Sequence, residues 1–309
     1  MTPAVAPGGR VLVTGGSGFI GRHVVAALRE AGHQVTVADL NTHPDDSLHC
    51  VTGDLNEPDA RAAAVTADTA AIVHLAAMTS VLGSVERPAQ VHRTNVEMTA
   101  GLLEAARRCG VGTVVLASTN AVIGDVGQST ITEALPSAPL TPYGGTKAAA
   151  EMLLSGYAGS YGIRAPTVRL TNVYGRGMSH KDSFVPRLLR AAATGGHVEI
   201  YGDGEQRRDL VFVGDVARAF TLAVQGWPSG PVIVGGSRSY TVNEITEVAR
   251  EATGMPIAVR PVAAKPGEMP AVVVDISRAR SLGFEPEVTL LAGMRSVWRD
   301  FMPDPDARA

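Results

Sequence analysis

A tyrosine and a lysine stand four residues apart in the segment TPYGGTK, as Tyr143 and Lys147. The segment opens a run with apolar residues three and four positions apart, which predicts a helix over Pro142 to Tyr161. Residues four apart share one helix face, so the lysine ammonium would lie near the phenol. A free tyrosine titrates near pH ~10, and a neighbouring positive charge lowers that pKa. The pair therefore predicts a base that takes a proton from an alcohol near neutral pH.

Two hydroxyl residues, Ser118 and Thr119, stand at the end of a predicted strand over Thr113 to Ser118. Ligands of open parallel sheets bind outside the carboxyl ends of the strands. A hydroxyl in that position can share the proton that the tyrosine takes. One of these two hydroxyls is therefore predicted to share the substrate proton with Tyr143.

Three glycines spaced by two residues, Gly15, Gly18 and Gly21, connect a predicted strand over Val11 to Thr14 with a predicted helix over Gly21 to Ala31. The first glycine permits a tight turn, the second lets backbone N–H groups approach a pyrophosphate, and the third allows close packing of helix on strand. The helix N-terminus adds partial positive charge. Because the triplet lies between a strand and a helix, it predicts a dinucleotide-phosphate site.

An acidic residue, Asp39, ends the next predicted strand, 18 residues beyond Gly21. This is close to the ~20-residue spacing at which a carboxylate meets the ribose hydroxyls of NAD. A carboxylate repels a 2′-phosphate, and no arginine lies between Asp39 and Cys50. The sequence therefore favours NAD over NADP. The positively charged nicotinamide ring would act together with the Lys147 ammonium to lower the pKa of Tyr143.

The elements that must position these residues alternate between short apolar runs and helical patterns, as expected for a parallel sheet covered by helices on both faces. The fold class is therefore α/β, a Rossmann-type doubly wound sheet with a smaller mixed α/β substrate-binding lobe. Further strands are predicted at Gln34 to Asp39, Cys50 to Asp54, Ala71 to Ala77 and Ala165 to Leu170, and further helices at Pro88 to Arg108, Phe184 to Thr194, Asp215 to Gln225, Val242 to Ala252 and Leu290 to Phe301.

The pattern becomes less regular after about residue 170. We expect residues 1–170 to form the NAD-binding domain and residues 171–309 mainly the second lobe, with about 209–235 returning to the first domain. No proline- or serine-rich linker separates the two, so they should pack together around a cleft.

The composition of this 309-residue chain excludes several classes of binding partner and site. Lysine and arginine total 27 against 30 acidic residues, without a basic run, so neither nucleic acid nor an anionic membrane is an expected partner. Two distant cysteines, Cys50 and Cys109, without ligand spacing, favour neither a disulfide scaffold nor a metal site. No signal peptide or membrane span is recognisable, so a cytoplasmic location is expected.

An ordered series of motifs along nearly the whole chain resembles the extended short-chain dehydrogenase/reductase family, specifically its NAD-dependent nucleotide-sugar epimerases and dehydratases. The motifs are TGGSGFIG (14–21), GDL (53–55), HLAA (74–77), STNAVIG (118–124), YGGTK (143–147), RLTNVYG (169–175), YGDGEQRRDLVFVGDVARA (201–219) and PGEMPAVVVDISRARSLGFEP (266–286).

The resemblance implies a role for each matching residue. Thr119 matches the catalytic Ser/Thr, Tyr143 the acid/base, and Lys147 the residue that binds the nicotinamide ribose and lowers the tyrosine pKa. Asn95 matches a helix-borne asparagine near the site, whereas His74 is expected to be a structural strand residue. Cofactor contacts are expected from Gly15, Gly18, Phe19, Ile20, Gly21, Asp39, Asn41, Asp54, Leu55, Leu75, Ala76, Ala77, Tyr143 and Lys147, and substrate contacts from Thr119, Tyr143, Asn172, Tyr201, Arg208, Lys265 and Glu268.

The chain also departs from the family pattern. Dehydratases carry an acidic pair directly after the catalytic threonine, where this chain has Asn120 and Ala121. An asparagine cannot serve as a general acid, so dehydration loses its chemistry while epimerisation does not. Ile123 replaces a usual aromatic, and Arg176 replaces a common proline.

The resulting hypothesis is an NAD-dependent 4-epimerase of a UDP-sugar of the UDP-glucose/UDP-galactose type, working through a 4-keto intermediate. UDP-glucuronate is the alternative substrate, with Arg176, Ser179 and His180 as candidates to meet its carboxylate. A nucleotide-deoxysugar 4-ketoreductase and a non-catalytic NAD-binding protein are further alternatives. The resemblance also implies a homodimer through the helices near 88–108 and 143–161.

Overall fold

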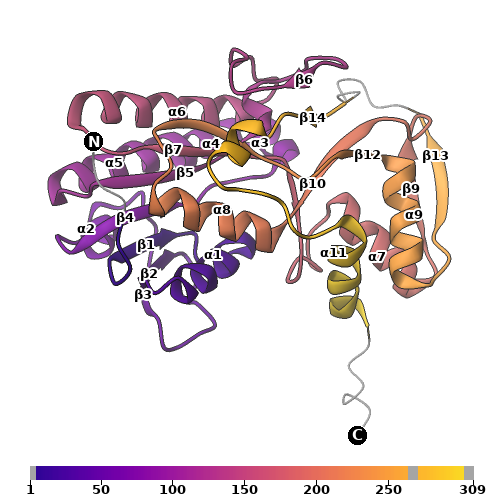
Figure 1. Ribbon diagram of the computed structural model, residues 1–309, viewed down its shortest axis with the longest axis horizontal. Helices are drawn as coiled ribbons and strands as arrows, with labels where there is room; N and C mark the ends of the chain where they lie inside the picture. The colour runs from indigo at the N-terminus through magenta and orange to yellow at the C-terminus, as the bar shows by residue number, and fades with distance from the viewer. Residues whose placement is uncertain (1–4, 264–270, 303–309) are drawn as a thin grey trace, which may run out of the picture.

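The computed structural model describes residues 5–263 and 271–302. Its centre is a seven-stranded sheet in the order β11-β7-β5-β4-β1-β2-β3, in which all neighbouring strands run parallel (Figure 1). The strand order reverses between β1 and β4, so a crevice is expected at their carboxyl ends. The strands are β1 (Arg10–Thr14), β2 (Gln34–Asp39), β3 (His49–Thr52), β4 (Thr69–His74), β5 (Thr113–Thr119), β7 (Pro166–Leu170) and β11 (Gly230–Val234).

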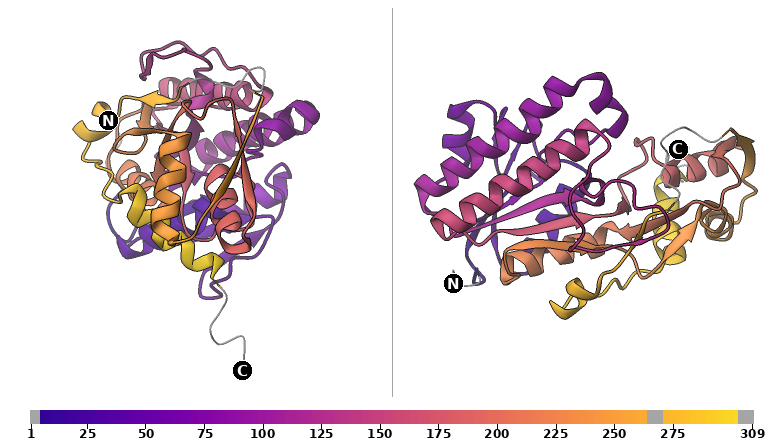
Figure 2. Two further views of the ribbon diagram at one scale, coloured as in Figure 1. Left: turned by 90° about the vertical axis from the view of Figure 1, so that its right-hand side faces the viewer. Right: turned by 90° about the horizontal axis from the view of Figure 1, so that it is seen from above.

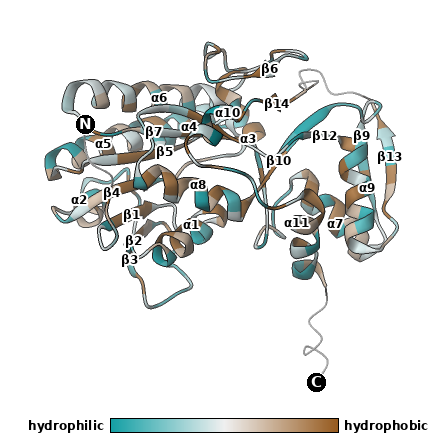
Figure 3. Cartoon of the chain, viewed as in Figure 1, coloured by the Kyte–Doolittle hydropathy of each residue, from teal (hydrophilic) through white to brown (hydrophobic). Residues whose placement is uncertain are grey.

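Helices cover both faces of this sheet, as predicted, because alternate strand residues point to opposite faces. On β1, Val11 and Val13 join one apolar core and Leu12 joins the other. Figure 3 shows that covering helices such as α1 carry apolar and hydrophilic residues side by side. One layer holds α2 (Pro58–Ala64), α5 (Met98–Cys109) and α6 (Pro142–Tyr161), and the other holds α1 (Phe19–Glu30) and α8 (Val213–Gln225).

Strand β4 ends earlier than predicted, at His74 instead of Ala77. Its neighbour β1 pairs with it only as far as Thr14, and the chain then turns away at Gly15. Residues 75–77 therefore leave the sheet edge and are available to line a cavity.

The predicted helix from Pro88 to Arg108 is interrupted by a π-helical turn. The structure has α4 (Pro88–His92), the turn η1 (Arg93–Glu97) and then α5. The turn carries the buried Asn95, whose side chain bonds Met78 N and O at 2.8 and 3.0 Å and Thr146 Oγ1 at 3.1 Å. These contacts tie the turn to α6, and such turns occur frequently at functional sites.

A smaller mixed lobe lies at one end of the large sheet, as the view from above in Figure 2 shows. Its core is a third apolar cluster that includes Leu188, Ile245 and Met294. The elements outside the large sheet and its helices are β8 (Asn172–Tyr174), β10 (Arg207–Phe212), β12 (Ser239–Thr241), β9 (His197–Tyr201), β13 (Ala258–Val262), α7 (Phe184–Thr194), α9 (Val242–Thr253), α11 (Leu290–Trp298) and η3 (Arg299–Phe301), with α3 (Val81–Glu86), η2 (Asn120–Val122), α10 (Ser277–Ser281), β6 (Thr130–Ile131) and β14 (Val273–Val274).

The chain crosses back to the large sheet after β10. Helix α8 packs against α1, and β11 pairs with β7 from Gly230 to Val234. Both elements come from the segment that was expected to return to the first domain. The division of the chain near residue 170 stays a prediction.

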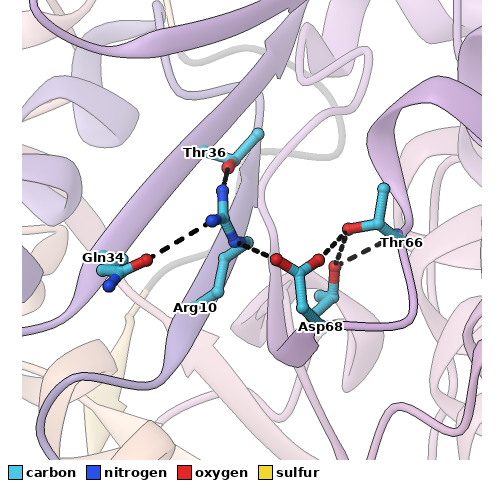
Figure 4. A network of polar contacts seen from close by, with 6 residues as sticks. Arg10, Gln34, Thr36, Thr66 and Asp68 are labelled. Atoms are coloured by element: carbon cyan, nitrogen blue, oxygen red, sulfur yellow. Dashed lines mark hydrogen bonds and ion pairs between the residues drawn. The ribbon is translucent and has the colours of Figure 1, made fainter.

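A polar network fixes the amino ends of the first strands, at the sheet edge opposite the crevice (Figure 4). Arg10 Nε lies 2.8 Å from Asp68 Oδ2, just before β4. The same guanidinium donates to Gln34 Oε1 at 3.4 Å and Thr36 Oγ1 at 3.5 Å on β2. Asp68 also accepts from Thr66 Oγ1 at 2.5 Å. The network joins β1, β2 and the turn before β4.

Candidate active site

Two adjoining cavities open at the carboxyl ends of the strands. The first has a volume of about 620 Å³ and the second about 370 Å³. The first is lined by fourteen predicted residues: Gly15, Gly18, Phe19, Ile20, Gly21, Asp39, Asp54, Leu55, Leu75, Ala76, Ala77, Thr119, Tyr143 and Lys147. The second is lined by Asn172, Tyr201 and Arg208 of the predicted set, and both share Phe19, Ile20, Thr171, Val173 and Lys181.

The glycine turn forms the end of the first cavity at α1. Gly15 has a φ of +70°, and a Cβ there would lie 2.7 Å from Ala76 N. A Cβ on Gly21 would lie 2.1 Å from Gly15 O. Helix α1 has no side-chain cap and no acidic residue in its first turn, so no side chain competes for its N-terminal N–H groups. The residues present therefore fit a dinucleotide diphosphate.

The carboxylate of Asp39 braces the glycine turn from the end of β2. Its Oδ2 accepts from Ser17 N at 3.0 Å and its Oδ1 from Asn41 N at 3.1 Å. Asn41 in turn accepts from Ser17 Oγ through its carbonyl at 2.9 Å, and it is not among the residues that line the cavity. Asp39 therefore occupies the position expected for ribose recognition, whereas the structure does not bring Asn41 to the cavity.

Tyr143 lies at the start of α6, where the backbone is firmly held. Thr141 caps the helix by accepting from Gly144 N at 3.2 Å, and Ser84 Oγ accepts from Tyr143 N at 3.1 Å. The Tyr143 side chain is 9% exposed, and its phenol is hydrogen-bonded to the Thr119 hydroxyl. The structure therefore brings together the tyrosine and threonine that the sequence paired.

Burial dominates the electrostatics of the pair in the protein alone. Burial raises the pKa of the Tyr143 phenol, and the hydrogen bond from Thr119 acts in the opposite direction. Burial lowers the pKa of Lys147 to about 8, against the attraction of Glu151. Desolvation is the largest influence on both groups in the protein alone, because the burial that shapes the cavity disfavours both charged forms.

His74 and Asn95 support the cavity floor. His74 is buried, with Nδ1 2.7 Å from Thr14 Oγ1 and Nε2 2.9 Å from Thr99 Oγ1. Burial, and secondarily the Lys147 charge, lower the His74 pKa to about 3. A neutral, fully bonded imidazole agrees with the structural role expected for it. Thr14 Oγ1 also accepts from Ala76 N at 3.2 Å, which holds the cavity-lining segment after β4.

The second cavity is lined by Arg208, the second of two adjacent arginines on β10. Arg208 lines the cavity, whereas Arg207 donates to Ser239 O at 3.2 Å and does not line it. The Asn172 amide donates to Asp209 O at 2.9 Å and thereby joins β8 to β10. The remaining predicted substrate contacts, Lys265 and Glu268, lie outside the described residues.

Sequence reasoning missed Lys181, which lines both cavities. Its ammonium lies 5.1 Å from the centre of the Phe19 ring, and burial lowers its pKa. The sequence signal was available, since Lys181 is one of three lysines and lies in the polar segment after NVYG. The residues considered in its place line neither cavity: Arg176 pairs with Asp300 at 2.9 Å, and Ser179 and His180 lie beside it in the loop.

Carboxylates are scarce around Tyr143. Among the described residues that line the first cavity, the carboxylates are Asp39, the last residue of β2, and Asp54, shortly after β3. Asn120 is buried in η2, directly after Thr119, and Ile123 directly after η2 is also buried.

Within residues 5–263 and 271–302, no group of three His, Cys, Asp or Glu side chains could hold a metal ion, and no helix is long and apolar enough to span a membrane.

Comparisons with known proteins agree with this geometry. The model of the family described as "NAD dependent epimerase/dehydratase family" matches residues 11–235. A putative UDP-glucose 4-epimerase from Methanocaldococcus jannaschii is 33% identical over 302 residues, covering 93% of this chain and 96% of the relative.

Two solved structures are also similar over nearly the whole chain. MoeE5 in complex with UDP-glucuronic acid and NAD has a TM-score of 0.87 at 36% identity, covering 94% of this chain and 98% of MoeE5. The UDP-N-acetylglucosamine 4-epimerase from Methanobrevibacter ruminantium M1 has a TM-score of 0.89 at 29% identity, covering 96% and 98%. The predicted fold, enzyme class and NAD dependence are thereby confirmed, and the chain belongs to the NAD dependent epimerase/dehydratase family.

Proposed function

We propose that the protein is an NAD-dependent 4-epimerase of a UDP-sugar. The observation that carries the proposal is the meeting of Thr119, Tyr143 and Lys147 in a cavity that adjoins a second one lined by Arg208. The first cavity has the glycine turn and Asp39 for the dinucleotide. The second is the place for the nucleotide sugar, so its C4 hydroxyl can reach the Tyr143 phenol where the two cavities meet.

Tyr143 would accept the proton of the C4 hydroxyl, with Thr119 as the hydrogen-bonding partner of both oxygens. NAD, when bound, supplies the hydride acceptor and donor. Lys147 would hold the nicotinamide ribose and, with its positive charge, favour the phenolate that burial alone disfavours. Tyr143 would return the proton after the 4-keto sugar has turned its other face, so no net oxidation results. The residues contribute orientation and a preset charge environment.

Arg208 is proposed to bind the substrate diphosphate. A guanidinium is permanently charged and can bind phosphate oxygens in a bidentate manner. Tyr201 and Gln206 line the same cavity, and Gln206 Nε2 donates to Tyr201 O at 2.9 Å, which fixes that wall. A nucleotide held there would direct its sugar toward the first cavity.

The proposed sugar is of the UDP-glucose/UDP-galactose type, with UDP-glucuronate as the alternative. The alternative is supported by Lys181, a cation at the junction of the cavities, and by the 36% identity to MoeE5, whose structure holds UDP-glucuronic acid. Lys181→Met distinguishes the two: it should lower kcat/KM for a uronate far more than for a neutral hexose.

Other reactions of related enzymes are less well supported. Dehydration requires an acid beside the sugar, and Asn120 and Ala121 follow Thr119 where dehydratases carry their acidic pair. A 4-ketoreductase would have to release its cofactor in every cycle, so cofactor retention during purification distinguishes it. The hydrogen-bonded Thr119 and Tyr143 argue against a non-catalytic NAD-binding protein.

The test is proton NMR of the purified protein, without added cofactor, incubated separately with UDP-glucose, UDP-N-acetylglucosamine and UDP-glucuronate. We expect a new galacto-configured anomeric signal that rises to an equilibrium mixture with one of them. No conversion in any sample, also after NAD is supplied, would contradict the proposal.

We also propose a homodimer that forms through α5 and α6. Helix α6 presents an exposed surface formed by Met152, Ser155, Gly156 and Gly159. Small residues at such spacing allow close approach of a helix from a second copy.

A further inference from the structure

A buried ion pair lies directly behind the proposed proton relay. Arg169 Nη2 lies 2.7 Å from Glu151 Oε2, and Arg169 Nε donates to Glu151 Oε1 at 3.0 Å. Ser118 Oγ donates to the same Oε1 at 2.5 Å. The Arg169 and Glu151 side chains are 5% and 4% exposed, so both charges are almost completely removed from water.

The cluster is adjacent to the relay along both elements that build it. Glu151 lies one helical turn beyond Lys147 on α6, and Ser118 immediately precedes Thr119 on β5. Arg169 stands opposite Ser118 in the register of β5 and β7. The carboxylate therefore lies on the side of Lys147 that faces away from Tyr143, since Tyr143 is four residues earlier on the same helix.

The Lys147 ammonium is charged in a buried site, yet it forms no salt bridge with a described carboxylate. Among the described residues, no carboxylate lies within ion-pair distance of it, although Glu151 is four residues away. Residues four apart on a helix are neighbours, so a carboxylate without other partners could approach the ammonium from this position. Here Arg169 and Ser118 already satisfy the carboxylate, so it attracts the ammonium without bonding to it.

We propose that Glu151 is a positioning residue that keeps Lys147 protonated, and that Arg169 holds it back from Lys147 so that the ammonium stays available to the cofactor ribose. The role assigned to Lys147 rests on the proposed function. The electrostatic arrangement itself does not, and it can be measured on the protein alone.

The charged and titratable groups around Lys147 determine in which direction its pKa changes when one of them is replaced. On α6 they are Tyr143 and Glu151. From the strands come the neutral His74 on β4 and Arg169 on β7, and Lys181 lines the same cavity. Glu151 is the one anion in this described set whose attraction opposes the desolvation of Lys147. Its neutralisation must therefore lower the Lys147 pKa.

The chain has three lysines, Lys147, Lys181 and Lys265, so selective ¹³Cε-lysine labelling gives three resolvable titration curves. The resonance that disappears in Lys147→Arg is the one that belongs to Lys147. In Glu151→Gln, which keeps the shape of the side chain, we expect the Lys147 pKa to fall by about one unit or more. Glu151→Asp, which keeps the charge, should remain closer to the wild-type value.

Arg169→Met provides a second test, in which the Lys147 pKa should change in the opposite direction. The released carboxylate should pair with Lys147, raise the Lys147 pKa and weaken NAD binding, because the ammonium is then occupied. Asp215→Asn is the matched control. Asp215 is equally buried, accepts from Glu287 N at 3.1 Å and Val288 N at 3.2 Å, and lies on α8 at the opposite face of the sheet. It should leave the Lys147 pKa unchanged.

A Lys147 pKa that is the same in Glu151→Gln and wild type, or that falls equally in Asp215→Asn, would overturn the proposal. If Glu151→Gln does not fold, an unchanged or lowered Lys147 pKa in Arg169→Met overturns it instead. Neither result requires turnover of any sugar. A failure of the epimerase proposal is therefore distinguishable from a failure of this one.

Discussion

Tyr143 is the residue on which the proposed chemistry depends most directly. Tyr143→Phe removes the hydroxyl that takes the proton and should lower kcat by about 10²- to 10⁴-fold. NAD and UDP binding should persist, because the ring still fills its buried position. The measurement is turnover together with calorimetric binding. Tyr157→Phe is the matched control: this tyrosine lies on the same helix, 3.5 Å from Glu104 Oε2 and outside both cavities, and should retain activity.

Lys147 makes cofactor binding dependent on pH. Its pKa of about 8 means that the ammonium is charged below that pH and neutral above it. If the ammonium holds the ribose, NAD affinity should be constant at lower pH and decrease as pH rises through about 8. Calorimetric titration between about pH 6.5 and about pH 9.5 would measure this. Lys147→Arg should bind without that decrease, since arginine stays charged. A constant wild-type affinity across the range would refute the assignment.

At the scale of elements, the junction of β1 and α1 has no space for an additional atom at Gly21. Gly21→Ala would place Cβ 2.1 Å from Gly15 O, a backbone atom that cannot move independently. We expect a loss of about 1–3 kcal/mol in the free energy of unfolding, together with loss of NAD binding. Urea unfolding followed by circular dichroism would measure it. Gly145→Ala is the control, because an added Cβ at this α6 position would have no atom within 4 Å, and it should gain up to ~1 kcal/mol.

Some helix boundaries are set by residues of the helix itself, and others are set by contacts with residues that are distant in sequence. Helix α6 begins and ends at the predicted residues, because Pro142 and the glycine after Tyr161 act within the chain itself. The helix predicted from Pro88 to Arg108 is interrupted because Asn95 is drawn toward Met78 and Thr146, which are distant in sequence. Apolar periodicity does not report such contacts.

At the scale of the whole molecule, the proposed dimer gives a prediction about mass. Met152 is 62% exposed on α6, and Met152→Glu would place a charge in the proposed contact. We expect wild type to have about twice the chain mass of 32.1 kDa by light scattering, and Met152→Glu to be a monomer. Met255→Glu, at an exposed methionine of the smaller lobe, should remain dimeric. A monomeric wild type at all concentrations would remove the proposal.

The amino-acid sequence determined the parts of this protein that depend on neighbouring residues. The glycine turn follows from the backbone freedom of Gly15, and the shared face of Tyr143 and Lys147 follows from helical spacing. The alternation of strands and helices likewise predicted the sheet and the cleft at its edge.

Only the tertiary structure decided which distant residues surround those groups. It placed Lys181 in both cavities, left Asn41 outside them, and joined Glu151 to Arg169 behind the lysine. It also buried Tyr143, and this burial raises the pKa of the phenol in the protein alone. The physical reason is that desolvation and charge act through space, and the distances involved are set by packing between segments that are far apart in the chain.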